Sequence, residues 1–126
     1  MRIENIKFKA KRLDNGEWVK GSFVVMKIPA LSKNTIGIVA EGGATLHEVD
    51  PSTVCQFTGL KDYEGNNIWE GDIAECEIYD LYKGFFKVKA VIEYMYGAFV
   101  AIIDGIPNSL YFKYIKVIGN KFDKEK

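Results

Sequence analysis

Apolar and polar residues alternate along most of the chain. Ile6, Phe8 and Ala10 alternate with three lysines, which is the two-residue period of a strand with one buried face. Similar alternation, or an apolar run of strand length, returns in residues 18–28, 35–40, 45–49, 73–79, 85–95, 98–103 and 117–118. No window keeps the 3.6-residue period of a long helix. The pattern therefore predicts an all-β fold without long helices.

Turn residues separate these predicted strands. Asn15-Gly16 lies between the first two, and because both residue types tolerate positive φ we expect a type I′ hairpin turn there. Asp50-Pro51 predicts one capped helical turn. We expect Asp104-Gly105 and Pro107-Asn108 to end the last apolar strand, with a single helical turn in residues 109–114. Short strands joined by such turns are typical of a small β-barrel or sandwich.

Charge is balanced overall but unevenly distributed. The 126 residues carry 17 basic and 17 acidic side chains. Residues 62–80 hold seven acids and no Lys or Arg, whereas residues 81–121 hold six lysines against two acids, and residues 1–12 hold five basic side chains against one acid. A zero net charge gives no general attraction to nucleic acid or to an anionic membrane. Complementary segments of this kind could neutralise each other within one chain or between subunits, which makes a homo-oligomer our expected assembly.

The sequence carries no sign of membrane insertion or secretion. No basic leader precedes an apolar run, and no stretch approaches the roughly 20 apolar residues of a membrane span. We therefore expect a soluble protein of the cytoplasm that has no membrane partner. Cys55 and Cys76 form no CxxC pair and are expected to be reduced packing residues.

The acid-rich segment QFTGLKDYEGNNIWEGD, residues 56–72, invites a calcium-loop interpretation. With Asp62 as the first ligand, the sixth position, which needs glycine, is Asn67. The twelfth position, which needs a bidentate glutamate, is Ile73. The segment fails at both demanding positions, and its glycines and amides are better explained as turns.

Other catalytic or metal-binding constellations are equally weak. His47 is the only histidine, and although Asp50 and Ser52 follow it, no nucleophile elbow surrounds a serine. A zinc site of His47, Cys55 and Cys76 would lack the close spacing of preorganised sites. We predict no catalytic residues, no cofactor and no metal, so the protein is expected not to be an enzyme. A metal-dependent enzyme using Asp62, Glu70 or Asp72 is the weakest alternative.

Nucleic-acid binding is the stronger alternative. Alternation places Phe85, Lys87 and Lys89 on one strand face, and Lys113 and Lys116 lie among further aromatic residues. Stacking rings and cations are the features with which small barrels bind single strands. The competing interpretation is that the rings form the core and the lysines are solvated.

The segment 56–72 also resembles a known family. Together with Ile73 it is similar to the hallmark of the YopX protein family, a phage and prophage family that typically reads QYTGLKDKNGKEIYEGDIV there. The similarity extends to IKFKA and NGEWV near the start, VDPSTV at 49–54 and IKVIGN at 115–120. The shared motif positions are Gln56, Thr58, Gly59, Leu60, Lys61, Asp62, Gly65, Gly71 and Asp72. Cys55, Phe57, Trp69 and Lys116 depart from the family pattern.

The resemblance implies a β-rich protein with a small SH3-like barrel, encoded by a phage or prophage of a bacterial host. It carries over no activity and no catalytic residue. We therefore expect an N-terminal β lobe over residues 1–55, a turn-rich connector over 56–72, an SH3-like barrel over 71–120 and a charged tail over 121–126. The expected function is that of a non-catalytic interaction module that binds itself or a host or phage protein.

Overall fold

The computed structural model describes residues 2–28 and 33–123, and these residues are almost all in strands or turns. The chain divides into two compact units, Met1–Phe57 and Thr58–Lys126. The predicted all-β fold is confirmed. The two described helical segments, η1 (Ile3–Asn5) and η3 (Pro51–Thr53), are single 3-10 turns, and neither has the length or apolar character needed to cross a membrane.

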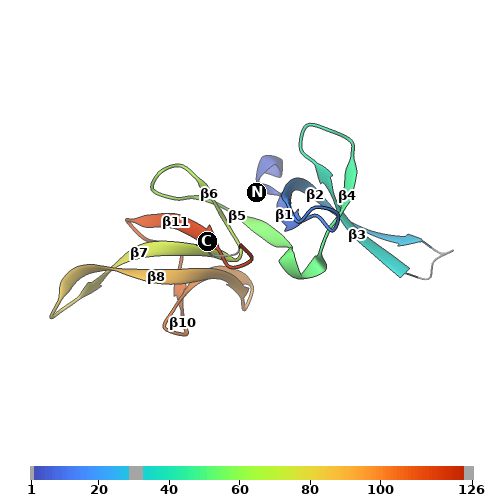
Figure 1. Cartoon of the computed structure of the whole chain (residues 1–126). Helices are drawn as coiled ribbons and strands as arrows, with labels where there is room; N and C mark the ends of the chain where they lie inside the picture. The colour runs from blue at the N-terminus through green and yellow to red at the C-terminus, as the bar shows by residue number, and fades with distance from the viewer. Residues whose placement is uncertain (1, 29–32, 124–126) are drawn as a thin grey trace. The chain divides into compact units, whose positions relative to one another are not determined.

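The first unit is built on an antiparallel sheet (Figure 1). Its strands follow the order β4-β3-β2-β1-β5. Their bounds are β1 (Phe8–Lys11), β2 (Trp18–Ile28), β3 (Lys33–Ala40), β4 (Leu46–Glu48) and β5 (Cys55–Lys61). Strand β5 runs past the division between the units and neighbours β6 (Asn67–Trp69) in the second unit.

One face of the first sheet forms a small core. Ala10, Val19, Ile38 and Val49 are buried there, and Phe8 packs against them. Phe8 and Ala10 occupy alternate positions of β1, so the lysines that follow them lie on the other face. The alternation in the sequence therefore located this core.

The hairpin between β1 and β2 forms, but its turn is not the predicted type I′. Asn15 is absent from the residues with positive φ, and only Gly16 adopts that conformation, at 72°. The N–H of Gly16 donates to the Arg12 carbonyl and the N–H of Arg12 to the Glu17 carbonyl, at 2.9 Å each. The loop between Lys11 and Trp18 is longer than the two residues of a type I′ turn, and within it the Asn15 carboxamide oxygen accepts from the Glu17 N–H.

The predicted cap before η3 is confirmed. The Asp50 carboxylate accepts from the backbone N–H of Ser52, and Pro51 opens the turn.

The second unit is built on a sheet in the order β10-β9-β8-β7-β11. Its strands are β7 (Asp72–Asp80), β8 (Gly84–Met95), β9 (Ala98–Ile103), β10 (Ile106–Ser109) and β11 (Ile115–Asn120). A two-residue turn at Tyr96-Gly97 joins β8 to β9, and another at Asp104-Gly105 joins β9 to β10. All four turn residues have positive φ. The helical turn expected over 109–114 is wrong, since Ser109 ends β10 and residues 110–114 form no helix. Pro107-Asn108, expected to end a strand, instead lies within β10, which pairs with β9 as an edge strand and so tolerates the proline.

The second sheet is not closed into the expected barrel. Its order ends at β10 and β11, and no pairing among the described residues joins these two strands. Leu110 and Phe112, in the segment between them, pack onto the core and do not extend the ladder. The core beneath the sheet consists of Ile68, Ala74, Cys76, Ala90, Ile92, Ala101, Ile103 and Ile115.

Candidate functional site

Asp62 of the family motif is a buried carboxylate surrounded by backbone donors. Its Oδ1 accepts from the N–H groups of Glu64 and Asn66, at 3.0 and 2.8 Å, and its Oδ2 accepts from Val117 N–H at 2.9 Å. Burial opposes ionisation, but these hydrogen bonds outweigh it, so the pKa of Asp62 lies below its ordinary value. The carboxylate therefore acts as a fixed acceptor for a loop and for a strand.

The same loop covers an edge of the second sheet. The N–H of Tyr63 donates to the Ile115 carbonyl at 2.7 Å, next to the bond from Val117 to Asp62. These two backbone groups of β11 point away from β7 and would otherwise form an open edge. The Asp62-Tyr63 turn satisfies them, so this part of the motif caps the sheet.

Asp72 performs a similar task at the other end of the motif. It is 2% exposed; its Oδ2 accepts from Trp69 N–H at 2.7 Å and its Oδ1 from the Asn120 side chain at 3.0 Å. Gly71, which lies between Trp69 and Asp72 in the sequence, has a φ of 85°, a conformation that favours glycine. Its N–H donates to the Ile92 carbonyl, and its own carbonyl accepts from Lys121 N–H. This turn therefore ties β8 and the end of β11 together.

The remaining motif residues lie in β5 and its turn. Gln56 is opposite Phe8 in the ladder, and the Thr58 hydroxyl donates to the Ile68 carbonyl at 2.7 Å. Gly59 and Gly65 both have a φ of 85°. Leu60 and Lys61 are exposed and line a shallow depression of about 220 Å³ with residues of the β10–β11 segment.

The motif carboxylates do not gather into a metal centre. Asp62 and Asp72 are each occupied by N–H donors, and Glu64 pairs with Lys116 at 3.1 Å. Within residues 2–28 and 33–123, no three side chains of the metal-binding types come together. Asp62 and Asp72 thus hold backbone groups in place.

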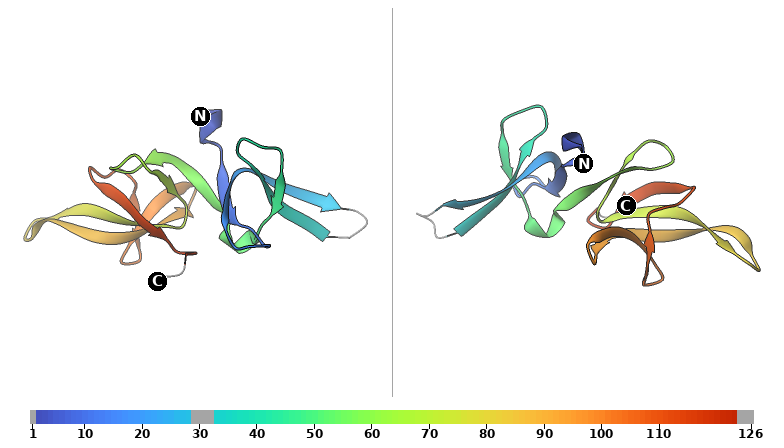
Figure 2. Two further views of the ribbon diagram at one scale, coloured as in Figure 1. Left: turned by 45° about the horizontal axis from the view of Figure 1, so that its top comes forward. Right: turned by 180° about the vertical axis from the view of Figure 1, so that it is seen from behind.

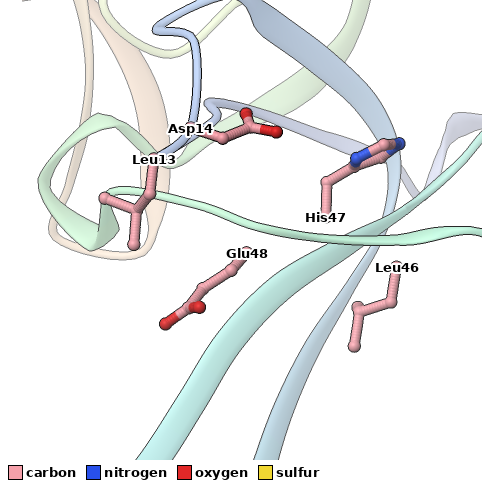
Figure 3. Close-up of a pocket in the computed structure, with 5 residues that line it drawn as sticks. All are labelled: Leu13, Asp14, Leu46, His47 and Glu48. Carbon is pink, nitrogen blue, oxygen red and sulfur yellow. The ribbon is translucent and has the colours of Figure 1, made fainter.

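The lone histidine lies in a separate depression of the first unit (Figure 3). Leu13, Asp14, Leu46, His47 and Glu48 line a hollow of about 310 Å³. Asp14 is held by a two-point contact from Arg12, whose hydrogen bond keeps the Asp14 pKa below its ordinary value. His47 and Glu48 point away from each other, as successive strand residues do.

The serine and the two cysteines considered as possible nucleophiles or metal ligands make structural contacts. The Ser52 hydroxyl donates to Asp50 at 2.8 Å, so it is not poised on His47. Cys55 and Cys76 are both fully buried. Burial, with the charge of Glu75, raises the pKa of the Cys76 thiol to about 11, which keeps it protonated and unreactive at neutral pH.

The predicted Lys and aromatic surface lies on the outward face of the β7–β8 hairpin. Phe85, Lys87 and Lys89 of β8 are all exposed there. Across the ladder they lie opposite Tyr79, Glu77 and Glu75 of β7, in that order. The structure thus brings two acids onto the face where sequence reasoning saw only cations and a ring.

The face continues onto β11. The Lys87 ammonium lies 4.7 Å from the centre of the Tyr114 ring and 3.7 Å from a Glu75 oxygen. Lys116 is opposite Glu75 in the ladder, and its hydrogen bond to Glu64 raises the Lys116 pKa. Lys113 is exposed in the segment before β11. Because Lys87 and Lys89 lie opposite acids and Lys116 pairs with Glu64, the five predicted positions do not form one purely cationic patch.

The end of this hairpin extends past its neighbours in the second unit (Figures 1 and 2). Strand β9 pairs with β8 only over Val91–Met95, and β11 pairs with β7 only over Asp72–Cys76. The Glu77 N–H donates to the Tyr114 carbonyl at 3.2 Å, and no other strand among the described residues covers the remaining hairpin edges. We call residues 77–88 the ribbon.

The tip of the ribbon carries exposed apolar side chains between Asp80 and Lys83. Leu81 is 84% exposed and Tyr82 97%, and the Tyr79 and Phe85 rings touch beside them with centres 5.0 Å apart. Sequence reasoning did not include Leu81, Tyr82 or Tyr79 in a surface. The turn at Lys83-Gly84 between two alternating strands was the available signal, because it fixes which residues face each other.

Fold and site together define a small all-β protein whose turn-rich motif braces an open antiparallel sheet. A family model described as YopX protein matches residues 7–125. The chain therefore belongs to the YopX family, as the resemblance of its motif indicated. A comparison with curated protein sequences gives no match.

Proposed function

We propose that this chain is a non-catalytic protein-binding module, encoded by a phage or prophage and working in the bacterial cytoplasm, that makes contact through its ribbon. The observation that carries the proposal is the exposed apolar tip on a two-stranded projection. An isolated two-stranded hairpin is marginally stable in water, and exposed aromatic residues are enriched where proteins bind each other.

The state of the motif supports the non-catalytic part of the proposal. Its two buried carboxylates accept hydrogen bonds from backbone and amide donors, and the Asp62 pKa is lowered, whereas a general acid at neutral pH needs a raised one. Both buried thiols lie away from solvent. These groups are used to hold the fold.

The proposal can be tested by a pull-down experiment that compares the wild-type chain with a tip variant and a control variant. Tagged wild-type chain, Leu81→Ser/Tyr82→Ser and a control, Tyr96→Ser/Ile106→Ser, would be produced in a bacterium that carries the gene. The control removes one exposed tyrosine from the β8–β9 turn and one exposed aliphatic side chain from the start of β10, in the same unit. Each protein retrieved would be purified and its binding measured directly.

We expect at least one partner to bind wild type and control with similar affinity and to bind the tip variant at least about tenfold more weakly, because hot-spot residues contribute about 2 kcal/mol or more. Equal binding by all three proteins, or no partner for any of them, would contradict the proposal. Circular dichroism spectra would establish that the variants are folded.

A further inference from the structure

The outward face of the ribbon and its base carries an ordered charge pattern. Three cross-strand pairs follow one another in the β7–β8 ladder, namely Tyr79 with Phe85, Glu77 with Lys87 and Glu75 with Lys89. We call these six residues the ribbon face. Each acid of β7 is level with a base of β8, and at the tip a ring is level with a ring.

This pattern is complementary to itself. A two-fold axis that runs parallel to the strands, midway between β7 and β8, turns the face over and places β7 of a second copy above β8 of the first. This rotation does not shift any residue along the strand direction, so each residue stays level with its cross-strand partner. Glu77 of the second copy then lies over Lys87, Glu75 of the second copy over Lys89, and the tip rings meet. Closed two-fold contacts need a self-complementary patch of this kind.

We propose that the ribbon face is the interface of a homodimer, in which two β7–β8 hairpins stack face to face about this axis. The inference rests on the proposed function, since it takes the ribbon as a contact surface and names a second copy of the chain as the partner. Stacked sheets lie about 10 Å apart with their strands within about 30° of each other, a spacing that side chains of this size fill.

The charges of the face favour a second copy over nucleic acid. In the six residues of the ribbon face, two acids on β7 lie opposite two bases on β8, so these residues carry no net charge with which to bind phosphates, and the neighbouring Lys116 of β11 is paired with Glu64. Lys87 already lies 3.7 Å from Glu75 on the same face. A protein surface that also carries a row of acids beside a row of bases is complementary to this face, and a second copy of the chain has such a surface.

The size of the face sets the expected strength. On β7 the ribbon face runs over five residues, from Glu75 to Tyr79, which span roughly 16 Å, and the two strands β7 and β8 span roughly 10 Å. The resulting patch is smaller than the ~800 Å² per partner of a standard stable interface, so we expect a weak dimer that forms at high micromolar concentration and is sensitive to salt.

Sedimentation velocity with charge variants tests the proposal. At low salt, the average mass should rise with concentration from the 14.3 kDa of one chain towards twice that value. Lys87→Glu/Lys89→Glu gives an all-acidic face and Glu75→Lys/Glu77→Lys an all-basic one. Each variant alone should dimerise at least about tenfold more weakly, because like charges then meet. An equimolar mixture of the two should dimerise at least as well as wild type.

Lys27→Glu/Lys61→Glu is the control for Lys87→Glu/Lys89→Glu, since it makes the same change in net charge at two exposed lysines outside the ribbon face. This control should leave dimerisation unchanged. A wild-type chain that stays monomeric, a dimer that both variants retain, or a mixture that stays monomeric would overturn the homodimer. If the homodimer is overturned but the binding of a different protein still depends on Leu81 and Tyr82, the proposed function stands without the homodimer. If nothing binds the tip either, both fail.

Discussion

Asp62 shows how a single side chain can look catalytic in a sequence and be structural in the fold. Its neighbourhood is rich in acids and amides, yet its two oxygens accept three backbone hydrogen bonds. The two local ones, to Glu64 and Asn66, follow from the known tendency of Asp to hold its own turn and could be predicted. The bond to Val117 could not, because it joins residues 55 positions apart and depends on which strand the chain places beside the loop.

Replacing Asp62 with Asn should destabilise the second unit by about 1–3 kcal/mol at neutral pH, because an amide would turn a donor towards Val117 N–H. The folded-state pKa of Asp62 is lowered, so the carboxylate stabilises the fold above the ordinary pKa of 3.8, and this contribution is lost as pH falls through the folded value. The difference between wild type and variant should therefore be largest at pH 7 and shrink below about pH 4.

Urea unfolding followed by the fluorescence of buried Trp69, in a Trp18→Phe background, would measure this difference at several pH values. Glu64→Gln is the control, since Glu64 is an exposed partner of Lys116 and its loss should leave the midpoint nearly unchanged. A difference that stays constant from pH 7 to pH 3 would show that the charge of Asp62 does not matter.

At the scale of the element, alternation located the strands well and turn chemistry less well. The predicted strand over 98–103 coincides with β9, and that over 73–79 is one residue short of β7 at each end. The errors came at turns: Asn15 stays out of the left-handed region, whereas Tyr96 adopts it with a φ of 53°. A tyrosine is a poor local signal for such a turn, and the strand pairing on both sides overrides its preference.

Gly21 marks a close approach of two elements. A Cβ atom on this residue would lie 1.9 Å from the Val39 carbonyl oxygen of β3. Gly21→Ala should therefore force β2 and β3 apart and destabilise the first unit by about 1–3 kcal/mol, as overpacking does. Urea unfolding followed by far-UV circular dichroism measures the loss.

Gly43→Ala is a suitable comparison in the same unit, because nothing lies within 4 Å of a Cβ atom placed there. That variant should stay within about 0.5 kcal/mol of wild type. Equal effects of the two substitutions would mean that β2 and β3 separate more easily than their register indicates.

At the scale of the whole molecule, the uneven charge of the sequence is partly resolved within the second unit. Acids of the 62–80 segment meet lysines of the 81–121 segment in pairs such as Glu75 with Lys87 and Glu64 with Lys116. Composition predicted that the segments could neutralise each other. It could not predict their positions, since these depend on the register between β7, β8 and β11. The lysines that suggested nucleic-acid binding are separated by acids for this reason.

We therefore expect no saturable binding of short single- or double-stranded DNA or RNA in fluorescence anisotropy, even at about 50 mM salt, where phosphate contacts are strong. Lys87→Glu/Lys89→Glu should give the same flat titration as wild type. Affinity that falls steeply with salt and disappears in this variant would establish the Lys and aromatic face as a nucleic-acid surface.

The long-range bonds of the motif also have a consequence for the order in which the chain can fold during synthesis. The long-range partners of Asp62 and Asp72 are Val117 and Asn120, which both lie in β11. Synthesis proceeds from the N-terminus, so the motif emerges some fifty residues before the groups that satisfy it. Closing loops of this length is slow compared with local pairing. The motif is complete only when β11 arrives, so folding of the second unit must finish after translation of its final strand.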